Sequence, residues 1–267
     1  MTWVQACVVS FYKYYIVMAS SELTLPPNID DLLRIGLSPF REPKGSATPL
    51  YDLDDHPDLL VRQEDGVFLD ELRLGLESIY KAVTYGVNVL PSKLVTVDGS
   101  RYVVTAKVNG EPLQKLLSEP NERLLGQIDN QYANLGHYLI GAMNKAESAC
   151  DDIYGPHQYM YGTILDDPQP KVWLVDLPNG AHDLGEANPY RGEIYNGRVM
   201  NWVNGIIEAE SIADTTLHTA RLVTEHAFAL SSSTHRGSEW VAAFRDALEQ
   251  RHELDSDEPP IADLRTF

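Results

Sequence analysis

The chain has 267 residues, of which 43% are hydrophobic, so it can bury one large core or two smaller ones. Lysine and arginine number 21 against 39 aspartates and glutamates, which gives a formal net charge of −18. That charge repels nucleic-acid backbones and anionic membrane surfaces, so we expect neither as a partner. Cys7 and Cys150 are too few for a disulfide framework and lack the spacing of zinc ligands, which predicts a protein of the reducing cytoplasm.

The first eighteen residues contain an apolar stretch without the pattern of a targeting signal. The stretch from Val8 to Met18 carries one charge, Lys13, and is shorter than the roughly 20 residues that a membrane-spanning helix needs. No basic cluster precedes it, as one does in a signal peptide. Met18 resembles a natural start, so whether residues 1–17 belong to the natural protein stays open, and the fold prediction excludes them.

The pattern of the chain divides it into four segments. Residues 1–44 form an extension and a proline-rich lead-in with at most one short helix. Residues 45–108 predict a small β-rich lobe with one main helix, and residues 109–252 predict a larger, mostly helical lobe. Residues 253–267 are an acidic tail that contains prolines. The predicted fold class is therefore α+β.

The small lobe predicts a strand, an amphipathic helix and a hairpin. Asp58 to Arg62 is strand-like, and apolar residues at helical spacing then run from Leu69 to Val83. Acids occupy the first turn of this helix, where the helix dipole favours them. Two β-rich runs, Lys93 to Val97 and Arg101 to Val108, surround the turn signal Asp98-Gly99, which predicts a hairpin.

The larger lobe opens with a long helix. Apolar residues at i, i+3 and i+7 predict a core-packed helix of about twenty residues from Leu125 to Lys145. A short hairpin follows, with strands Tyr159 to Leu165 and Lys171 to Leu177 and a turn from Asp166 to Pro170. Three further segments have helical patterns: Ile194 to Ile207, Ile212 to Leu230 and Ser238 to His252.

The strand around Val172 ends on a single carboxylate, Asp176, and then breaks at Pro178. A carboxylate that a buried strand delivers to an open edge is often a site of metal and phosphate chemistry. Asp176 is therefore the starting point for a functional interpretation.

Taken in order, the elements from Gly45 to Ile207 resemble the two-lobed protein kinase and aminoglycoside phosphotransferase superfamily. The piece that begins at Gly45 resembles the phosphate-covering loop, with one glycine where the family has two or three. Arg62 stands where the family has the strand lysine that holds nucleotide phosphates, and Glu77 or Glu71 stands where it has the partner of that lysine. Arginine keeps the charge but changes reach and geometry.

The segment from Tyr102 to Leu113 resembles the family's hinge between the lobes, a strand that ends in an extended linker before a new helix. The resemblance implies that backbone groups of Thr105, Ala106, Lys107 and Val108 bind the adenine edge of ATP. The long helix after the hinge resembles the helix that precedes the family's catalytic loop.

Asp176 resembles the family's metal-binding aspartate, which implies an Mg²⁺ ion that bridges phosphates. The family also places a catalytic Asp five residues before a metal-binding Asn. Asp152 can serve here as the base and Gln158 as the amide ligand, but Gln158 comes six positions after Asp152 instead of five, and this loop contains no Asn. An alignment on the following strand puts Tyr154 and Tyr159 at the two positions instead.

Each of these residues also has a plain structural interpretation. Asp176 is equally a turn former at a strand end. Glu77 has Arg73 four residues before it and Lys81 four residues after it, so surface ion pairs explain it. Arg62 at a strand end is more often solvated than functional.

Two functional hypotheses follow, and the sequence favours the first because the glycines, the lysine and the catalytic pair are all altered. The first is a kinase-like pseudoenzyme that has lost or altered phosphotransfer and binds a nucleotide, a small molecule or a protein partner. The second is an active phosphotransferase for a small molecule or a protein, which uses ATP and Mg²⁺, with Arg62 on phosphate, Asp152 as base, and Asp176 with Gln158 on the metal. A third interpretation is an unrelated α+β fold whose elements match this order by chance.

Overall fold

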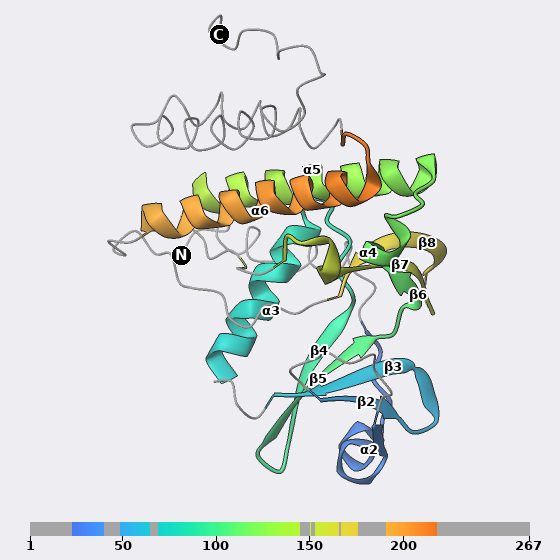
Figure 1. Ribbon diagram of the computed structural model, residues 1–267. Helices are drawn as coiled ribbons and strands as arrows, with labels where there is room; N and C mark the ends of the chain where they lie inside the picture. The colour runs from blue at the N-terminus through green and yellow to red at the C-terminus, as the bar shows by residue number, and fades with distance from the viewer. Residues whose placement is uncertain are drawn as a thin grey trace, which may run out of the picture.

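The computed structural model describes residues 23–39, 49–64, 69–144, 150, 153–165, 167–175 and 191–217 (Figure 1). In this part of the chain the protein is mixed α+β, as the sequence predicts. One sheet has five strands in the order β1-β2-β3-β5-β4, and the other has three in the order β6-β7-β8. The helices of the described ranges include none with the length and apolar character of a membrane span.

The five-stranded sheet is antiparallel throughout and consists of β1 (Leu37–Pro39), β2 (Leu50–Leu53), β3 (His56–Gln63), β4 (Ser92–Val97) and β5 (Ser100–Ala106). Its alternating apolar residues pack with the short helix α2 (Ile29–Ile35) into a first hydrophobic cluster, whose members include Leu33, Leu59, Val61, Val97 and Val104. The predicted hairpin is confirmed, because Asp98 (φ 50°) and Gly99 (φ 88°) form a two-residue turn between β4 and β5. The sequence did not predict β1 and β2, which are too short to show alternation.

Helix α3 (Leu69–Val83) confirms the predicted amphipathic helix between the strands. It buries Leu72, Ile79 and Ala82. Two other members of the predicted stripe, Leu69 and Leu76, remain only half-buried. The stripe is therefore wider than the face that packs in the core.

The three-stranded sheet joins distant parts of the chain: β6 (Asn109–Pro112), β7 (Tyr159–Ile164) and β8 (Asp167–Leu174). Strand β6 lies in the predicted hinge and pairs with β7 through Gly110 and Gly162. A Cβ atom on Gly110 would lie 2.1 Å from the carbonyl oxygen of Tyr161, so this close approach requires glycine. The predicted turn is wrong for residues 167–170, which belong to β8. Strand β8 tolerates Pro168 and Pro170 because it is an edge strand of this sheet.

The helices of the second half are α4 (Leu113–Leu116), α5 (Glu122–Asn144) and α6 (Arg191–Ala213), with the 3₁₀ helix η1 (Pro156–Gln158) before β7. Helix α5 confirms the prediction. The predicted break after Ile207 is wrong, because α6 continues to Ala213 and ends where Asp214 adopts a φ of 49°. The helix predicted at Ser238 to His252 lies outside the described residues.

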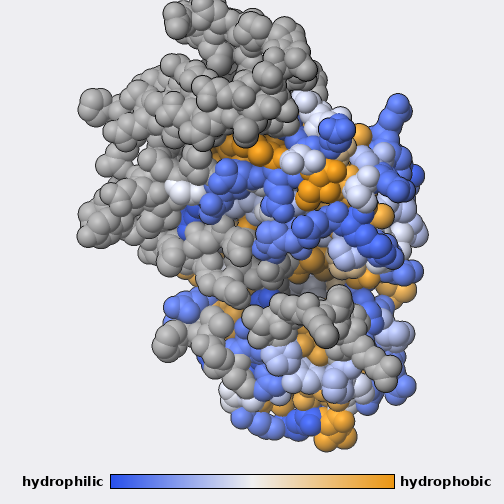
Figure 2. Space-filling view, in the orientation of Figure 1, coloured by the Kyte–Doolittle hydropathy of each residue, from blue (hydrophilic) through white to orange (hydrophobic). Residues whose placement is uncertain are grey.

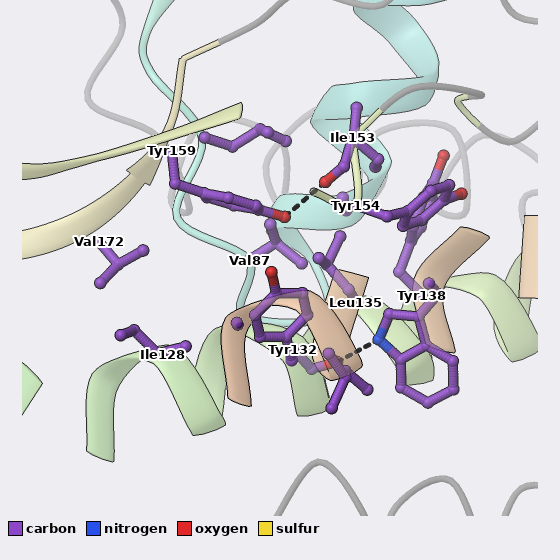
Figure 3. Close-up of a cluster of buried hydrophobic side chains, with 14 of the residues drawn as sticks. Val87, Ile128, Tyr132, Leu135, Tyr138, Ile153, Tyr154, Tyr159 and Val172 are labelled. Atoms are coloured by element: carbon purple, nitrogen blue, oxygen red, sulfur yellow. Dashed lines mark hydrogen bonds between the residues drawn. The ribbon is translucent and has the colours of Figure 1, made fainter. Parts of the chain in front are cut away.

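Helices α5 and α6 lie side by side (Figure 1), and a small residue lets them approach closely. A Cβ atom on Gly136 would lie 2.4 Å from the Trp202 ring, and the Trp202 Nε1–H donates to the Tyr132 carbonyl at 3.0 Å. A second hydrophobic cluster unites α3, α5, α6, β7 and β8 (Figure 3), and its members include Ile79, Val87, Leu135, Tyr159, Leu174 and Trp202. The core face of α3 therefore packs with the helices of the second half of the chain.

The connector between α3 and β4 is held by hydrogen bonds from α5 and β8. The Asn88 N–H donates to Gln131 Oε1 at 3.0 Å, and Gln131 Nε2 donates to the Asn88 carbonyl at 3.1 Å. The Leu174 N–H donates to the same carbonyl at 2.9 Å, and the Leu90 N–H donates to the Leu174 carbonyl at 3.2 Å. The connector and the end of β8 thus form one hydrogen-bonded unit.

Gln127 repeats this arrangement one helical turn earlier on α5. Its Nε2 donates to the Pro170 carbonyl at 3.0 Å, and its Oε1 accepts from the Val172 N–H at 3.1 Å. These contacts satisfy backbone groups on the outer edge of β8. One face of α5 therefore holds both the connector and this sheet edge.

We predict that Gln131→Met destabilises the protein by about 1 to 3 kcal/mol, because Gln131 is only 2% exposed and its loss leaves the Asn88 N–H without a partner. Gln127→Met is the matched control. Its side chain is half-buried, so water can replace it, and we expect a loss below about 1 kcal/mol. Urea unfolding of both variants measures the difference, and equal losses would contradict the burial argument.

Candidate functional site

The predicted hinge begins at the end of β5, where two residues are already engaged in hydrogen bonds. The Ala106 N–H donates to the Pro91 carbonyl at 2.9 Å. Thr105 Oγ1 accepts from Ser92 Oγ at 2.8 Å and donates to the Pro91 carbonyl at 3.2 Å. Both residues are therefore held to the start of β4, and the Ala106 N–H is not available to a ligand.

The next two residues of the hinge differ from each other. The Lys107 N–H donates to the Asp58 carbonyl at 2.7 Å, and its Nζ lies 2.7 Å from Asp52 Oδ1 on β2. Val108 is half-buried against the first hydrophobic cluster and makes no hydrogen bond in the described part of the chain. Of the four predicted adenine contacts, Val108 alone keeps both its N–H and its C=O open.

Arg62 lies near the end of β3 with 12% of its side chain exposed, and it forms an ion pair with Glu64, which is 4% exposed. Glu77 and Glu71 are exposed on α3, and within the described residues neither pairs with Arg62. The predicted partner is therefore wrong. Glu64 is two residues further along the same extended segment, so its side chain projects to the same side as that of Arg62.

The predicted surface ion pairs of Glu77 are also missing within the described residues. Glu77 makes no ion pair there with Arg73 or Lys81. Its side chain instead lines a groove between α3 and β4.

Gln158 ends η1 and is 3% exposed. Its carbonyl accepts a hydrogen bond from the Val175 N–H at 3.0 Å, so the residue directly before Asp176 lies against Gln158. Gln158 Nε2 lies 3.0 Å from His157 Nε2. Asp176 itself and Asp152 lie outside the described residues.

The oxygens of an amide and a carboxylate suit Mg²⁺, so the chemistry of the predicted pair, Gln158 and Asp176, fits that ion. The hydrogen bond from the Val175 N–H brings the residue before Asp176 to Gln158, although Val175 and Gln158 are 17 positions apart in the sequence. The described ranges contain no cluster of three or more His, Cys, Asp or Glu side chains that could hold a metal. Of this predicted site, the structure describes Gln158 and the backbone hydrogen bond that joins it to Val175.

Two tyrosines anchor the loop that leads to Gln158 (Figure 3). The Tyr154 hydroxyl donates to the Cys150 carbonyl at 2.7 Å, and the Tyr159 hydroxyl donates to the Ile153 carbonyl at 2.6 Å. Both rings are buried, so in either alignment these tyrosines hold the loop by its backbone. The residue five positions before Gln158 is Ile153, which is fully buried and has no ionisable group.

Tyr132 on α5 belongs to the same buried cluster. Its ring centroid lies 6.0 Å from that of Tyr159. Its hydroxyl is buried and has no hydrogen-bond partner among the described residues. Burial raises the pKa of the Tyr132 hydroxyl, with a further contribution from Glu208, and burial likewise raises the pKa of Tyr159. Both hydroxyls therefore stay protonated in the folded protein.

Sequence reasoning missed Glu64 and the clamp between Asn88 and Gln131. The position of Glu64, two residues after Arg62, was a usable signal, because alternate residues of an extended chain share a side. The clamp had no such signal, since 43 positions separate its two residues.

Comparison with protein-family models and with curated proteins found no relative of this chain. The candidate site is therefore defined by its own residues: the open backbone of Val108, the ion pair between Arg62 and Glu64, and Gln158 beside the end of β8.

We predict that Tyr159→Phe destabilises the protein by about 1 to 3 kcal/mol, because the buried Ile153 carbonyl loses its donor. The matched control is Tyr132→Phe. It removes a hydroxyl that has no partner among the described residues, so we expect no loss or a small gain in stability. Thermal and urea unfolding measure both variants, and a larger loss for Tyr132→Phe would contradict the assignment.

We also predict that the free energy of unfolding falls as the pH rises above about 10, where tyrosines of the unfolded chain ionise. The pKa values of Tyr132 and Tyr159 are raised in the folded state, so their stabilising contribution is complete below that pH and is lost above it. Tyr159→Phe should reduce the alkaline slope by up to about 1.4 kcal/mol per pH unit. Urea unfolding between pH 8 and 11 tests this, and a flat profile for the wild type would contradict it.

Proposed function

We propose that this chain is a two-lobed, protein kinase-like scaffold that binds a nucleotide at its hinge and has lost or altered phosphotransfer. It acts as a nucleotide-binding or regulatory pseudoenzyme. The observation that carries the proposal is the open N–H and C=O of Val108, at the position where the resemblance implies that adenine binds. A single residue that offers a donor and an acceptor side by side matches the paired edge of a purine base.

The order of the elements supports the scaffold. The strands β1, β2 and β3, the helix α3 and the hairpin β4–β5 precede the hinge. The helices α4 and α5, an anchored loop, the hairpin β7–β8 and the helix α6 follow it. This is the order that the family resemblance implies. The link from β5 into β6 connects the two sheets directly, so a ligand at Val108 would lie where they meet.

Two features favour the loss or alteration of phosphotransfer. The buried carboxylate of Glu64 pairs with Arg62, which offsets the positive charge that a nucleotide phosphate would need there. Ile153 stands five residues before Gln158, where the family has its catalytic Asp, and it cannot accept a proton. Asp152, one residue earlier, is the candidate base of an active enzyme.

In this proposal Gln158 and Asp176 would hold Mg²⁺ beside the phosphates. The ion would neutralise phosphate charge. The chain's own part would be to fix the two ligands. The hydrogen bond from the Val175 N–H to the Gln158 carbonyl supports this, because it holds the residue before Asp176 against Gln158. The buried Tyr154 and Tyr159 hold the approach to Gln158 in place.

We predict that ATP stabilises the wild type in a thermal shift assay, by about 2.7 kcal/mol at one hundred times Kd. Val108→Pro removes the open N–H and should abolish the shift. Val108→Ala is the matched control, because it keeps the N–H and should retain the shift. Asp176→Asn should lose only the part that depends on Mg²⁺.

A wild type that gains no stability at millimolar ATP would refute nucleotide binding. A shift of equal size in Val108→Pro, whose unliganded melting temperature serves as the check on folding, would refute the hinge as its site. Sustained conversion of ATP to ADP that Asp152→Asn abolishes would identify an active phosphotransferase instead.

A further inference from the structure

A groove with a volume of about 330 Å³ lies between α3 and β4. Strand β4 is an edge strand of the five-stranded sheet, and α3 lies on the same side of the sheet as this edge (Figure 1). The proposed contacts to nucleotide do not use the groove. Figure 2 shows a face of the protein on which hydrophilic side chains dominate the coloured surface, as its 39 acids lead one to expect.

The backbone of β4 is open toward the groove at two residues. Val97 and Ser100 flank a two-residue turn, so they form a hydrogen-bonded pair. Hydrogen-bonded and non-hydrogen-bonded pairs alternate along an antiparallel ladder, so the backbone N–H and C=O groups of Leu94 and Thr96 point away from β5. The backbone groups of Ser92 also point away from β5, because its N–H and its C=O both form hydrogen bonds with the Tyr80 hydroxyl on α3. Leu94 and Thr96 make no hydrogen bond in the described part of the chain.

An extended peptide can add as a further strand to an edge strand whose alternate residues have unpaired backbone N–H and C=O groups. Tyr80 closes the edge at Ser92, so the open part begins at Leu94 and continues to Thr96. The edge therefore offers a peptide a defined register.

The floor of the groove is apolar. Leu69 and Leu76 of α3 and Leu94 of β4 line it, and all three are half-buried. Successive side chains of an added strand point to opposite faces, so every second residue of a peptide would face this floor. Apolar peptide residues at those positions would bury the exposed parts of these three leucine side chains.

The charged residues of the groove favour an acidic peptide. Arg73 and Lys93 line it and make no ion pair among the described residues, and Glu77 is the acid among its lining residues. Two cations to one acid give a positive site on a chain whose net charge is −18. A peptide carboxylate near Arg73 and Lys93 is therefore complementary to this site.

We propose that the groove and the open edge of β4 bind an extended segment of a partner protein, which adds as a strand, places alternate apolar side chains on the leucine floor and sets a carboxylate at Arg73 and Lys93. This inference does not depend on nucleotide binding. The partner is defined by its chemistry: apolar residues at alternate positions, with acidic residues between or beside them.

The test uses a phage-displayed library of random dodecapeptides selected on the full chain, after which the most enriched peptide is synthesised with a fluorescent label. We expect the enriched sequences to be acidic and to alternate apolar residues. Thr96→Pro removes an N–H that points away from the β4–β5 ladder, so it should weaken the peptide's Kd at least about tenfold while sparing the sheet. Thr96→Ala keeps that N–H and is the matched control. The double variant Arg73→Glu, Lys93→Glu should also weaken binding at least about tenfold.

The proposal is overturned if no acidic, alternating peptide is enriched, or if the enriched peptide binds the Thr96→Pro and charge-reversed variants as tightly as the wild type. Circular dichroism checks folding, and if Thr96→Pro does not fold, the charge-reversed variant decides. Sedimentation that shows a concentration-dependent dimer, lost in the charge-reversed variant, would identify a second copy of the chain as the occupant and would also overturn the proposal.

Discussion

The arrangement of the described elements around the candidate site depends on the backbone N–H and C=O of Asn88. Its N–H and its C=O both bond to the buried Gln131 side chain, and the same C=O also accepts from the Leu174 N–H. Backbone groups that leave water must find partners inside the protein, and here the partners come from two different elements. The long helix, the strand β8 and the connector after α3 are thereby fixed to one another.

The candidate site inherits its geometry from this clamp. Leu174 is held to Asn88, and the next residue, Val175, donates to the Gln158 carbonyl. The position of Gln158 relative to the end of β8 is thus set by two backbone hydrogen bonds, which lead back through Asn88 to the Gln131 side chain on α5. The tyrosine hydroxyls on the other side of the loop complete the support, since each satisfies a loop carbonyl from within the core.

Charge is arranged differently in two parts of the five-stranded sheet and the neighbouring helix α3. At the end of β3 the positive charge of Arg62 meets a buried acid, Glu64. Along the β4 groove, Arg73 and Lys93 make no ion pair in the described ranges. Buried pairs contribute chiefly by avoiding an uncompensated charge, whereas open cations attract a partner from solution.

The sequence alone determined the elements whose signals are local. Helical periodicity located α3 and α5, and the Asp98-Gly99 turn located the β4–β5 hairpin, because spacing and turn chemistry act between near neighbours. Only the tertiary structure decided the strand β6, the early start of β8, the partner of Arg62 and the open backbone of Val108. Each of these depends on which distant backbone or carboxylate comes within hydrogen-bond reach, and no local pattern in the chain encodes that distance.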